Sequence, residues 1–432
     1  MTFRLLRFRN WSFTINTIPH KEMVIERYKG EMKPRIVFFV YYDNLNVIGS
    51  LLYAIKKWLD SGYAVSVVAL TDDITNLFGA HSQVFENVKI RMPLPVRIVS
   101  MFFSLSGTAL KRVGLSIPLS PIAGFIRMCY FSLCCSLKTK KDSFIIATDP
   151  PSLWAAAINS RKTGNPYIYS VRELFLSGDT RNVVDKAVKY LERRANKKAF
   201  YTVEFDDVRA GLLKDDNGLR PESMLVVPNA PPGNAERKNV HYFHKKFQIP
   251  IAKKIVLYTG GIADYNLTYE IMNTVDSWPL DVLLVMHCWG AQKDIEQLKR
   301  YATRFQREIF FSTEMMPFSE IANLYASCNV GLALYGDGDL NHKYTGLSSG
   351  KMFNFLKECV PVITNNTVAC KKAIGENGCG ICINDLSEIS NAIKIILADE
   401  EVFRGRCQAS FSAFSFDNNY QKLIEAVKVA AA

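Results

Sequence analysis

The sequence predicts an α/β protein with two Rossmann-like, doubly wound domains that face each other across a cleft. Its 432 residues suit two or three domains. Short apolar runs, each suited to a buried strand, alternate with helical patterns. The alternation stops at the proline-rich stretch Val227–Gly233 and then begins again. Strand, helix and strand at this spacing are typical of a parallel sheet.

The first domain is expected over residues 35–232, after a basic N-terminal arm at residues 1–34. Apolar runs predict five buried strands. They are Arg35–Tyr42, Ala64–Leu70, Ser143–Thr148, Tyr167–Val171 and Phe200–Phe205. Helical patterns lie between them at Gly49–Leu59, Ser152–Lys162, Val183–Lys198 and Asp207–Lys214.

The second domain is expected over residues 251–412, after a linker at residues 233–250. A C-terminal helix, residues 413–432, is expected to return to the first domain. The predicted strands are Lys254–Thr259, Val282–His287, Ile309–Phe311, Val330–Tyr335 and Pro361–Asn365. The predicted helices are Asn266–Asp276, Gln292–Phe305, Ser319–Ser327, Lys351–Lys357 and Leu386–Ala398.

The net charge of +12 is concentrated in two places. Residues 91–141 hold eight basic side chains and no acidic one, and the N-terminal arm is also basic. Aromatic and aliphatic residues lie between these charges, which favours contact with an anionic membrane surface over nucleic acid. Alternatively, these residues form helices that pack on the sheet and expose a basic face.

Nothing in the sequence predicts an integral membrane protein or a secreted one. No uncharged apolar run reaches the roughly 18–20 residues that a spanning helix needs, and no signal peptide is recognisable. Ten scattered cysteines suit reduced, buried thiols rather than disulfides. We therefore expect a cytoplasmic protein, peripheral at the inner face of the plasma membrane.

Four stretches, in this order, resemble family 4 glycosyltransferases, the retaining nucleotide-sugar enzymes of GT-B fold. Asp149–Arg172 resembles their helix, "G-x-P" turn and strand, and Tyr201–Pro232 resembles their approach to the linker. Lys254–Gly261 is similar to the glycine loop that opens their second domain. Pro317–Thr364 resembles their "K-x-x-E-Y-L-x-x-G-x-P-V-I" signature. The resemblance covers about residues 36–430.

The resemblance implies transfer of a sugar from a nucleoside-diphosphate sugar, with retention, to a lipid-linked or cell-surface glycan. Two other functions stay open. One is a nucleotide-sugar epimerase of the same fold, which would need a cluster of acids and a histidine that the sequence does not display. The other is a non-catalytic relative that binds glycan or lipid.

The second alternative is motivated by departures from the family pattern. Asn354 stands where the family signature has an acid, and Gly346 stands where one subgroup has a second acid eight positions earlier. Cys359 replaces a usual glycine. An amide oxygen at Asn354 accepts hydrogen bonds more weakly than a carboxylate does.

The candidate nucleotide-binding residues are Gly260, Gly261, Lys351 and Asn354. Backbone amides of a glycine loop and a lysine can stabilise the charge that develops on a departing diphosphate without a metal. Each of these also has a simpler interpretation. Gly260-Gly261 could form an ordinary strand-to-helix turn, and Lys351 could be a surface lysine. Asn354 follows Lys351 by three residues, on the same helical face.

The candidate catalytic residues are Arg172, Glu173 and Asp149, each directly after a predicted strand. The carboxyl ends of parallel strands are where this fold binds its ligands. Alternatively, Arg172 and Glu173 form a local ion pair.

No metal site or cofactor is expected. Cys379-x2-Cys382 has the spacing of metal ligands but lacks a second ligand pair, and Asp337-x-Asp339 is typical of a solvent-exposed loop.

Overall fold

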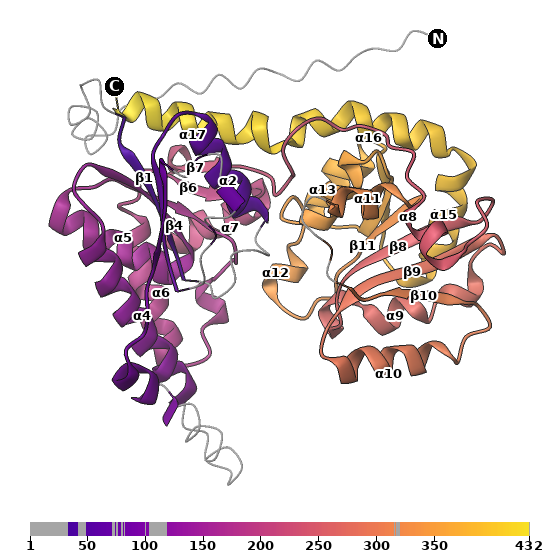
Figure 1. The fold of residues 1–432 in the computed structure, drawn as a ribbon, viewed down its shortest axis with the longest axis horizontal. Helices are drawn as coiled ribbons and strands as arrows, with labels where there is room; N and C mark the ends of the chain where they lie inside the picture. The colour runs from indigo at the N-terminus through magenta and orange to yellow at the C-terminus, as the bar shows by residue number, and fades with distance from the viewer. Residues whose placement is uncertain are drawn as a thin grey trace.

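The computed structural model describes residues 33–41, 49–70, 83–99, 119–314 and 320–431, and the isolated positions 74, 77, 78, 81, 101, 102 and 316. Within these residues the chain forms two parallel sheets, each flanked by helices, side by side in Figure 1. The predicted fold class is confirmed. Most of the basic arm, together with Lys111 and Arg112 of the basic segment, lies outside the described residues.

The first sheet has the strand order β3-β2-β1-β4-β5-β6-β7. Its strands are β1 (Arg35–Val40), β2 (Val65–Ala69), β3 (Phe85–Lys89), β4 (Ser143–Thr148), β5 (Tyr167–Ser170), β6 (Thr202–Glu204) and β7 (Met224–Val226). Its helices are α2 (Gly49–Asp60), α4 (Leu119–Lys138), α5 (Asp149–Thr163), α6 (Val183–Asn196) and α7 (Asp207–Asn217). All the pairings are parallel, so the carboxyl ends of the strands share one edge.

The second sheet has the order β10-β9-β8-β11-β12-β13. Its strands are β8 (Lys254–Gly261), β9 (Val282–Trp289), β10 (Ile309–Ser312), β11 (Val330–Ala333), β12 (Val362–Asn365) and β13 (Gly380–Ile383). The helices of this half are α8 (Tyr242–Phe247), α9 (Thr268–Met272), α10 (Gln292–Ala302), α11 (Ile321–Ala326), α12 (Leu340–Lys343), α13 (Gly350–Lys357), α14 (Val368–Cys370), α15 (Ile389–Ala398) and α16 (Glu400–Phe414), and the chain ends in α17 (Phe416–Ala431).

Several elements differ from the sequence-based expectation, among them two edge strands and one helix. The edge strands β3 and β7 were not predicted, because edge strands are only partly buried and lack a continuous apolar run. The predicted helix Asn266–Asp276 is divided into α9 and two short 3₁₀ turns. Leu267 has φ = 54°, a left-handed conformation that interrupts a helix.

Residues 233–250 include α8, which buries Phe243 in the apolar core of the second half. This segment is therefore not extended throughout. The second sheet has an apolar core on each of its faces, and α13 lies on the same face as α8 and α11. Alternate residues of β8 and β9 point to this face, among them Leu257 and Val285.

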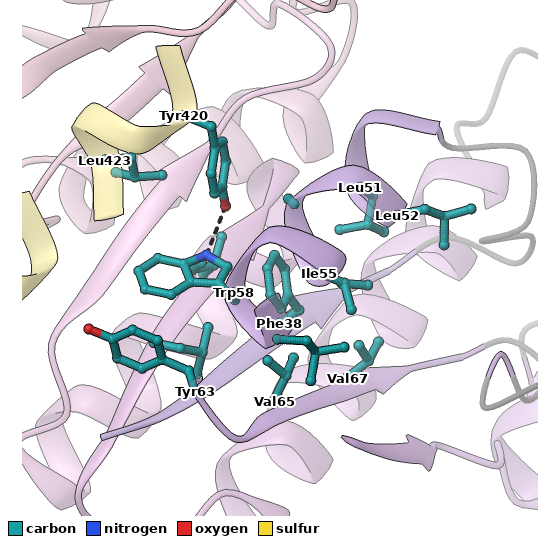
Figure 2. Packing of buried hydrophobic residues seen from close by; sticks show 14 of the residues in the cluster. Phe38, Leu51, Leu52, Ile55, Trp58, Tyr63, Val65, Val67, Tyr420 and Leu423 are labelled. Carbon is teal, nitrogen blue, oxygen red and sulfur yellow. Dashed lines mark hydrogen bonds between the residues drawn. The ribbon is translucent and has the colours of Figure 1, made fainter. Parts of the chain in front are cut away.

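The C-terminal helix α17 packs against α2 of the first sheet. In Figure 1, α16 and α17 run across both halves of the molecule. Figure 2 shows Trp58 of α2 at this contact, where its indole donates a hydrogen bond of 3.0 Å to the hydroxyl of Tyr420. Leu423 and other apolar residues of α17 complete the core around them. This burial ties the end of the chain to the first domain.

Candidate functional site

Two contacts between loops bring the carboxyl ends of the two sheets together. The amide side chain of Asn341 in α12 accepts a hydrogen bond of 2.6 Å from the backbone of Leu174 and donates one of 3.2 Å back to it. Asn229, which precedes the second half, donates from its side chain to the carbonyl of Ser348 at 2.8 Å. The loop after β5 therefore lies against the loop after β11, where the fold places ligands.

Lys351 stands at the beginning of α13, in the second half of this junction. Its Nζ lies 4.0 Å from the ring centroid of Tyr335 and 5.8 Å from that of Tyr258, and donates to the carbonyl of Leu334 at 3.3 Å. Burial among these groups lowers the pKa of Lys351 to about 7. Within the described residues no carboxylate forms an ion pair with Lys351. The lysine is therefore suited to bind an anion.

Ser349 begins α13 as its N-cap and was not singled out from the sequence. Its hydroxyl accepts from the backbone N–H of Met352 at 3.2 Å and lies 2.6 Å from the hydroxyl of Tyr335. The signal was available, because a serine before Gly350-Lys351 and an apolar run is a typical helix start. The cap fixes the helix end, whose free N–H groups favour negative charge.

Gly260 and Gly261 belong to β8, which corrects the expectation of a glycine loop. They pair with Cys288 and Trp289 of β9, beyond the last β8 residue paired with β11. A Cβ on Gly260 would lie 3.2 Å from the hydroxyl of Tyr258, the ring that also faces Lys351. The two glycines thus reach the same edge as Lys351, as strand residues without side chains to obstruct a ligand.

Asn354 lies one turn after Lys351 and is partly buried. Its side chain hydrogen bonds with Tyr325. Burial raises the pKa of Tyr325, and the hydrogen bonds with Thr259 and Asn354 oppose this rise only in part. The amide therefore already has one partner inside the protein and retains capacity for further hydrogen bonds. Gly260, Gly261, Lys351 and Asn354 are thus placed around one end of the second sheet.

In the first half, Asp149 shapes the loop that follows β5. Its Oδ1 accepts hydrogen bonds from the backbone N–H groups of Arg172 at 3.0 Å and Glu173 at 3.3 Å. Asp149 is buried and has φ = 59°, an uncommon conformation for a residue other than glycine. These contacts suit Asp149 to positioning the loop. Arg172 turns toward α2, where it donates to the hydroxyl of Ser50 at 2.8 Å.

Glu173 lies in this loop next to Leu174, the residue that contacts Asn341 of the second half. Its side chain is exposed to solvent, and charged groups from both halves act on its carboxyl. Desolvation and the charge of Asp149 raise the pKa of Glu173, while Arg209, Arg172 and His342 lower it. A carboxyl with a raised pKa at a junction of two domains is a candidate for proton transfer.

His342 was missed by sequence reasoning, although it belongs to this junction. Its ring stacks on Tyr265 with centroids 4.2 Å apart, and its Nδ1 lies 2.8 Å from Oδ1 of Asp339. Asp339 also caps α12 by accepting from the N–H of His342 at 3.0 Å. Asp337 and Asp339 themselves are exposed and lie outside any helix, as expected for a solvent loop, and α12 begins directly after them. No local pattern indicated that it would meet the loop of Glu173.

The absence of an acid at Gly346 has a steric explanation. A Cβ on this buried glycine would lie 2.3 Å from the Cβ of Ala369 and 3.4 Å from Oδ2 of Asp206. That oxygen of Asp206 is buried and has no hydrogen-bond partner among the described residues. A carboxylate at position 346 would therefore need α14 to move and would face a second buried acid.

We expect Gly346→Ala to lower the free energy of unfolding by about 1 kcal/mol or more, because an added methyl overpacks this contact. Thermal or denaturant unfolding of the two proteins measures the difference. Gly178→Ala is the matched control, since a Cβ there meets nothing within 4 Å. Equal destabilisation by the two changes would contradict the steric explanation.

The described parts of the chain show neither a metal cluster nor a membrane-spanning helix. Within them, no three histidine, cysteine, aspartate or glutamate side chains gather closely enough to hold a metal ion. None of the helices found there combines the length and apolar character needed to cross a bilayer.

The fold and the junction match the GT-B arrangement of two facing Rossmann-like halves. Residues 285–403 match the family model of the glucosyltransferase 3-like C-terminal domain. Part of the second half, which includes Lys351 and Asn354, is thus similar to a glycosyltransferase domain of this type. A search of curated protein sequences found no match to the chain.

Solved structures with the same fold cover nearly the whole chain. HepE from Anabaena, in complex with UDP and glucose, is 14% identical, covers 92% of this chain and 100% of its own, and has a TM-score of 0.66. The UDP-forming α,α-trehalose-phosphate synthase of Burkholderia vietnamiensis is 11% identical, with coverage of 93% and 100% and a TM-score of 0.64. Sucrose-phosphate synthase from Thermosynechococcus elongatus is 14% identical, with coverage of 91% and 100% and a TM-score of 0.59.

Proposed function

We propose that the protein transfers a sugar from a nucleoside-diphosphate sugar to a glycan acceptor. The observation that supports this most directly is the desolvated Lys351 at the N-terminus of α13, inside the segment that matches a glycosyltransferase domain. A lysine beside the N–H groups of a helix start stabilises a diphosphate both when it is bound and when it leaves.

The same groups support a reaction that needs no metal ion. The negative charge that develops on the leaving diphosphate would be met by Lys351 and by the N–H groups at the start of α13. Retention fits front-face attack, in which the departing phosphate takes the acceptor proton while the protein stabilises charge. Glu173 and Arg172, across the junction, are the proposed groups on the sugar side.

A titration with UDP-, GDP- and other nucleotide sugars tests this function. We expect one donor to bind and to release its nucleoside diphosphate slowly by hydrolysis, at the same rate with and without EDTA. Binding without any turnover, even with acceptor glycans, would favour a non-catalytic relative. A changed sugar that is still attached to the nucleotide would indicate an epimerase.

We further propose that the acceptor is lipid-linked or close to a membrane, and that the first half of the chain binds anionic lipid. Exposed apolar side chains include Leu94 at 65%, Phe102 at 64% and Leu137 at 65% exposure. Exposed cations accompany them at Arg91, Arg97, Lys138, Lys140 and Lys141. The hydroxyl of Tyr130 in α4 donates to the carbonyl of Arg91 at 3.2 Å, so the two segments adjoin.

Vesicles that contain anionic lipid test the membrane contact. Each cation that reaches the surface contributes up to about 1 kcal/mol, and salt screens this attraction. We expect cosedimentation at low salt, reduced by high salt and by replacing Arg91, Arg97 and Lys138 with glutamine. Replacing Lys293, Lys299 and Arg300 of α10 removes the same charge from the second half and should have little effect. Absence of cosedimentation with these vesicles at low salt would indicate a soluble acceptor.

A further inference from the structure

Trp289 is a large aromatic side chain left open to solvent at the end of β9. It is 54% exposed, whereas Trp58 is fully buried and Trp278 is 3% exposed. Trp289 pairs with Gly261 of β8, and its Nε1 lies only 3.3 Å from the position that a Cβ on Gly261 would occupy. The ring therefore lies beside Gly261, in space that the glycine leaves free.

The ring lies on the face of the sheet that also carries Lys351. Residues two apart on a strand share a face, and Val285 of β9 packs in the same core cluster as Phe353 and Leu356 of α13. Trp289 is four residues after Val285, so it points to the α13 side. Lys351 in the first turn of that helix contacts the end of β11 through the carbonyl of Leu334.

The distance across the sheet suits a nucleotide. β8 lies between β9 and β11, so the ends of β9 and β11 are two strand spacings apart, about 10 Å. This span is comparable with the length of a nucleoside diphosphate from its phosphates to its base. With the phosphates at Lys351, the ribose would pass Gly260 and Gly261, and the base would reach Trp289.

Polar groups lie next to the ring. His287 shares its face of β9, with ring centroids 6.3 Å apart, and its Nδ1 lies 3.0 Å from the hydroxyl of Ser312. Burial lowers the pKa of His287 to about 4, so its imidazole is neutral near pH 7. A neutral imidazole held through one nitrogen presents the other as a single donor or acceptor, which is suited to the edge of a base.

We propose that Trp289 is the stacking platform for the nucleobase of the donor, with His287 beside it as a polar contact. This inference rests on the proposed nucleotide-sugar function and adds to it the residue that holds the base. Stacking on an aromatic ring tolerates any base, since every base has a π-face. The platform therefore contributes affinity for the nucleoside, while selection among bases depends on polar contacts such as His287.

Calorimetric titration with UDP, GDP and inorganic pyrophosphate tests the platform. We expect Trp289→Leu to weaken the preferred nucleotide about tenfold or more, with pyrophosphate affinity unchanged. Trp289→Phe should retain most of the nucleotide affinity, yet it should lose the quenching of tryptophan fluorescence that we expect for the wild-type protein on binding. Tyr190→Leu, which removes another exposed aromatic ring, should match the wild type.

The outcomes separate the platform from the function on which it rests. Unchanged nucleotide affinity in Trp289→Leu, or an equal loss for nucleotide and pyrophosphate, would overturn the platform and leave the proposed function standing. If the wild-type protein binds no nucleotide, the proposed function fails and the platform fails with it. Thermal unfolding of each variant confirms that a loss of binding is not a loss of fold.

Discussion

Glu173→Gln is expected to lower turnover by about a hundredfold or more, because a charged group placed to stabilise the charge that develops in the transition state contributes about 10²–10³-fold to a reaction rate. Glutamine keeps the size and most hydrogen-bonding capacity of glutamate but carries no negative charge. Donor affinity should therefore change little. Steady-state kinetics, with kcat and KM measured separately for the donor, distinguish the two effects. Arg172→Ala should also reduce kcat more than donor affinity.

The pH dependence gives a second check on Glu173. If its deprotonated form is required, activity is lost as pH falls through the pKa of this carboxyl. Desolvation and Asp149 raise that pKa, so the acidic limb should lie above the ordinary range for glutamate and should disappear in Glu173→Gln. Glu222→Gln is the matched control, since Glu222 pairs with Arg220 in another loop. Full turnover in Glu173→Gln and in Arg172→Ala would move the catalytic role elsewhere, with Asp149 as the next candidate.

Lys351→Ala is expected to weaken nucleotide binding about ten- to a hundredfold, because it removes a charge-assisted contact of roughly 1.5–3 kcal/mol. Calorimetry with the nucleoside diphosphate measures this loss. Lys357→Ala, in the last turn of the same helix, is the matched control. Unchanged nucleotide binding by a folded Lys351→Ala protein would show that Lys351 does not bind the diphosphate.

The lowered pKa of Lys351 predicts the direction of a pH effect on binding. Its amine loses its proton as pH rises through about 7 in the ligand-free protein. A bound diphosphate favours the charged form and raises this pKa, so binding takes up a proton above about pH 7. Nucleotide affinity should therefore fall as pH rises above 7, and this dependence should be absent in Lys351→Ala.

Gly346 and Asn354 have different explanations as departures from the acidic family pattern. Asn354 keeps a polar side chain beside Lys351 and hydrogen bonds with Tyr325. At Gly346 the structure leaves no room for a side chain, because Ala369 and Asp206 occupy the space. The loss of an acid at position 346 thus follows from close packing between the halves, and activity does not have to be lost with it.

The local pattern of the sequence determined the fold class and the edge of the second sheet that carries Lys351. Alternating apolar runs and helical patterns predict parallel sheets, because burial of strands and helix faces is visible in the order of neighbouring residues. The same reasoning placed Arg172, Glu173 and Asp149 after strands of the first half. This reasoning did not predict edge strands such as β3, because their partly polar composition gives no continuous apolar run.

Which of these residues meet depends on the tertiary structure. His342 approaches Glu173 because Asn341 docks on Leu174, 167 residues earlier in the chain. Asp206 faces Gly346, and Trp289 lies beside Gly261, for the same kind of reason. The sequence encodes the periodicity of each element, but contacts between strand ends depend on strand order, register and the packing of two separate sheets. Strand order, register and sheet packing are set only when the whole chain is folded. Individual residues of the junction could therefore be predicted from the sequence, but their arrangement into one site could not.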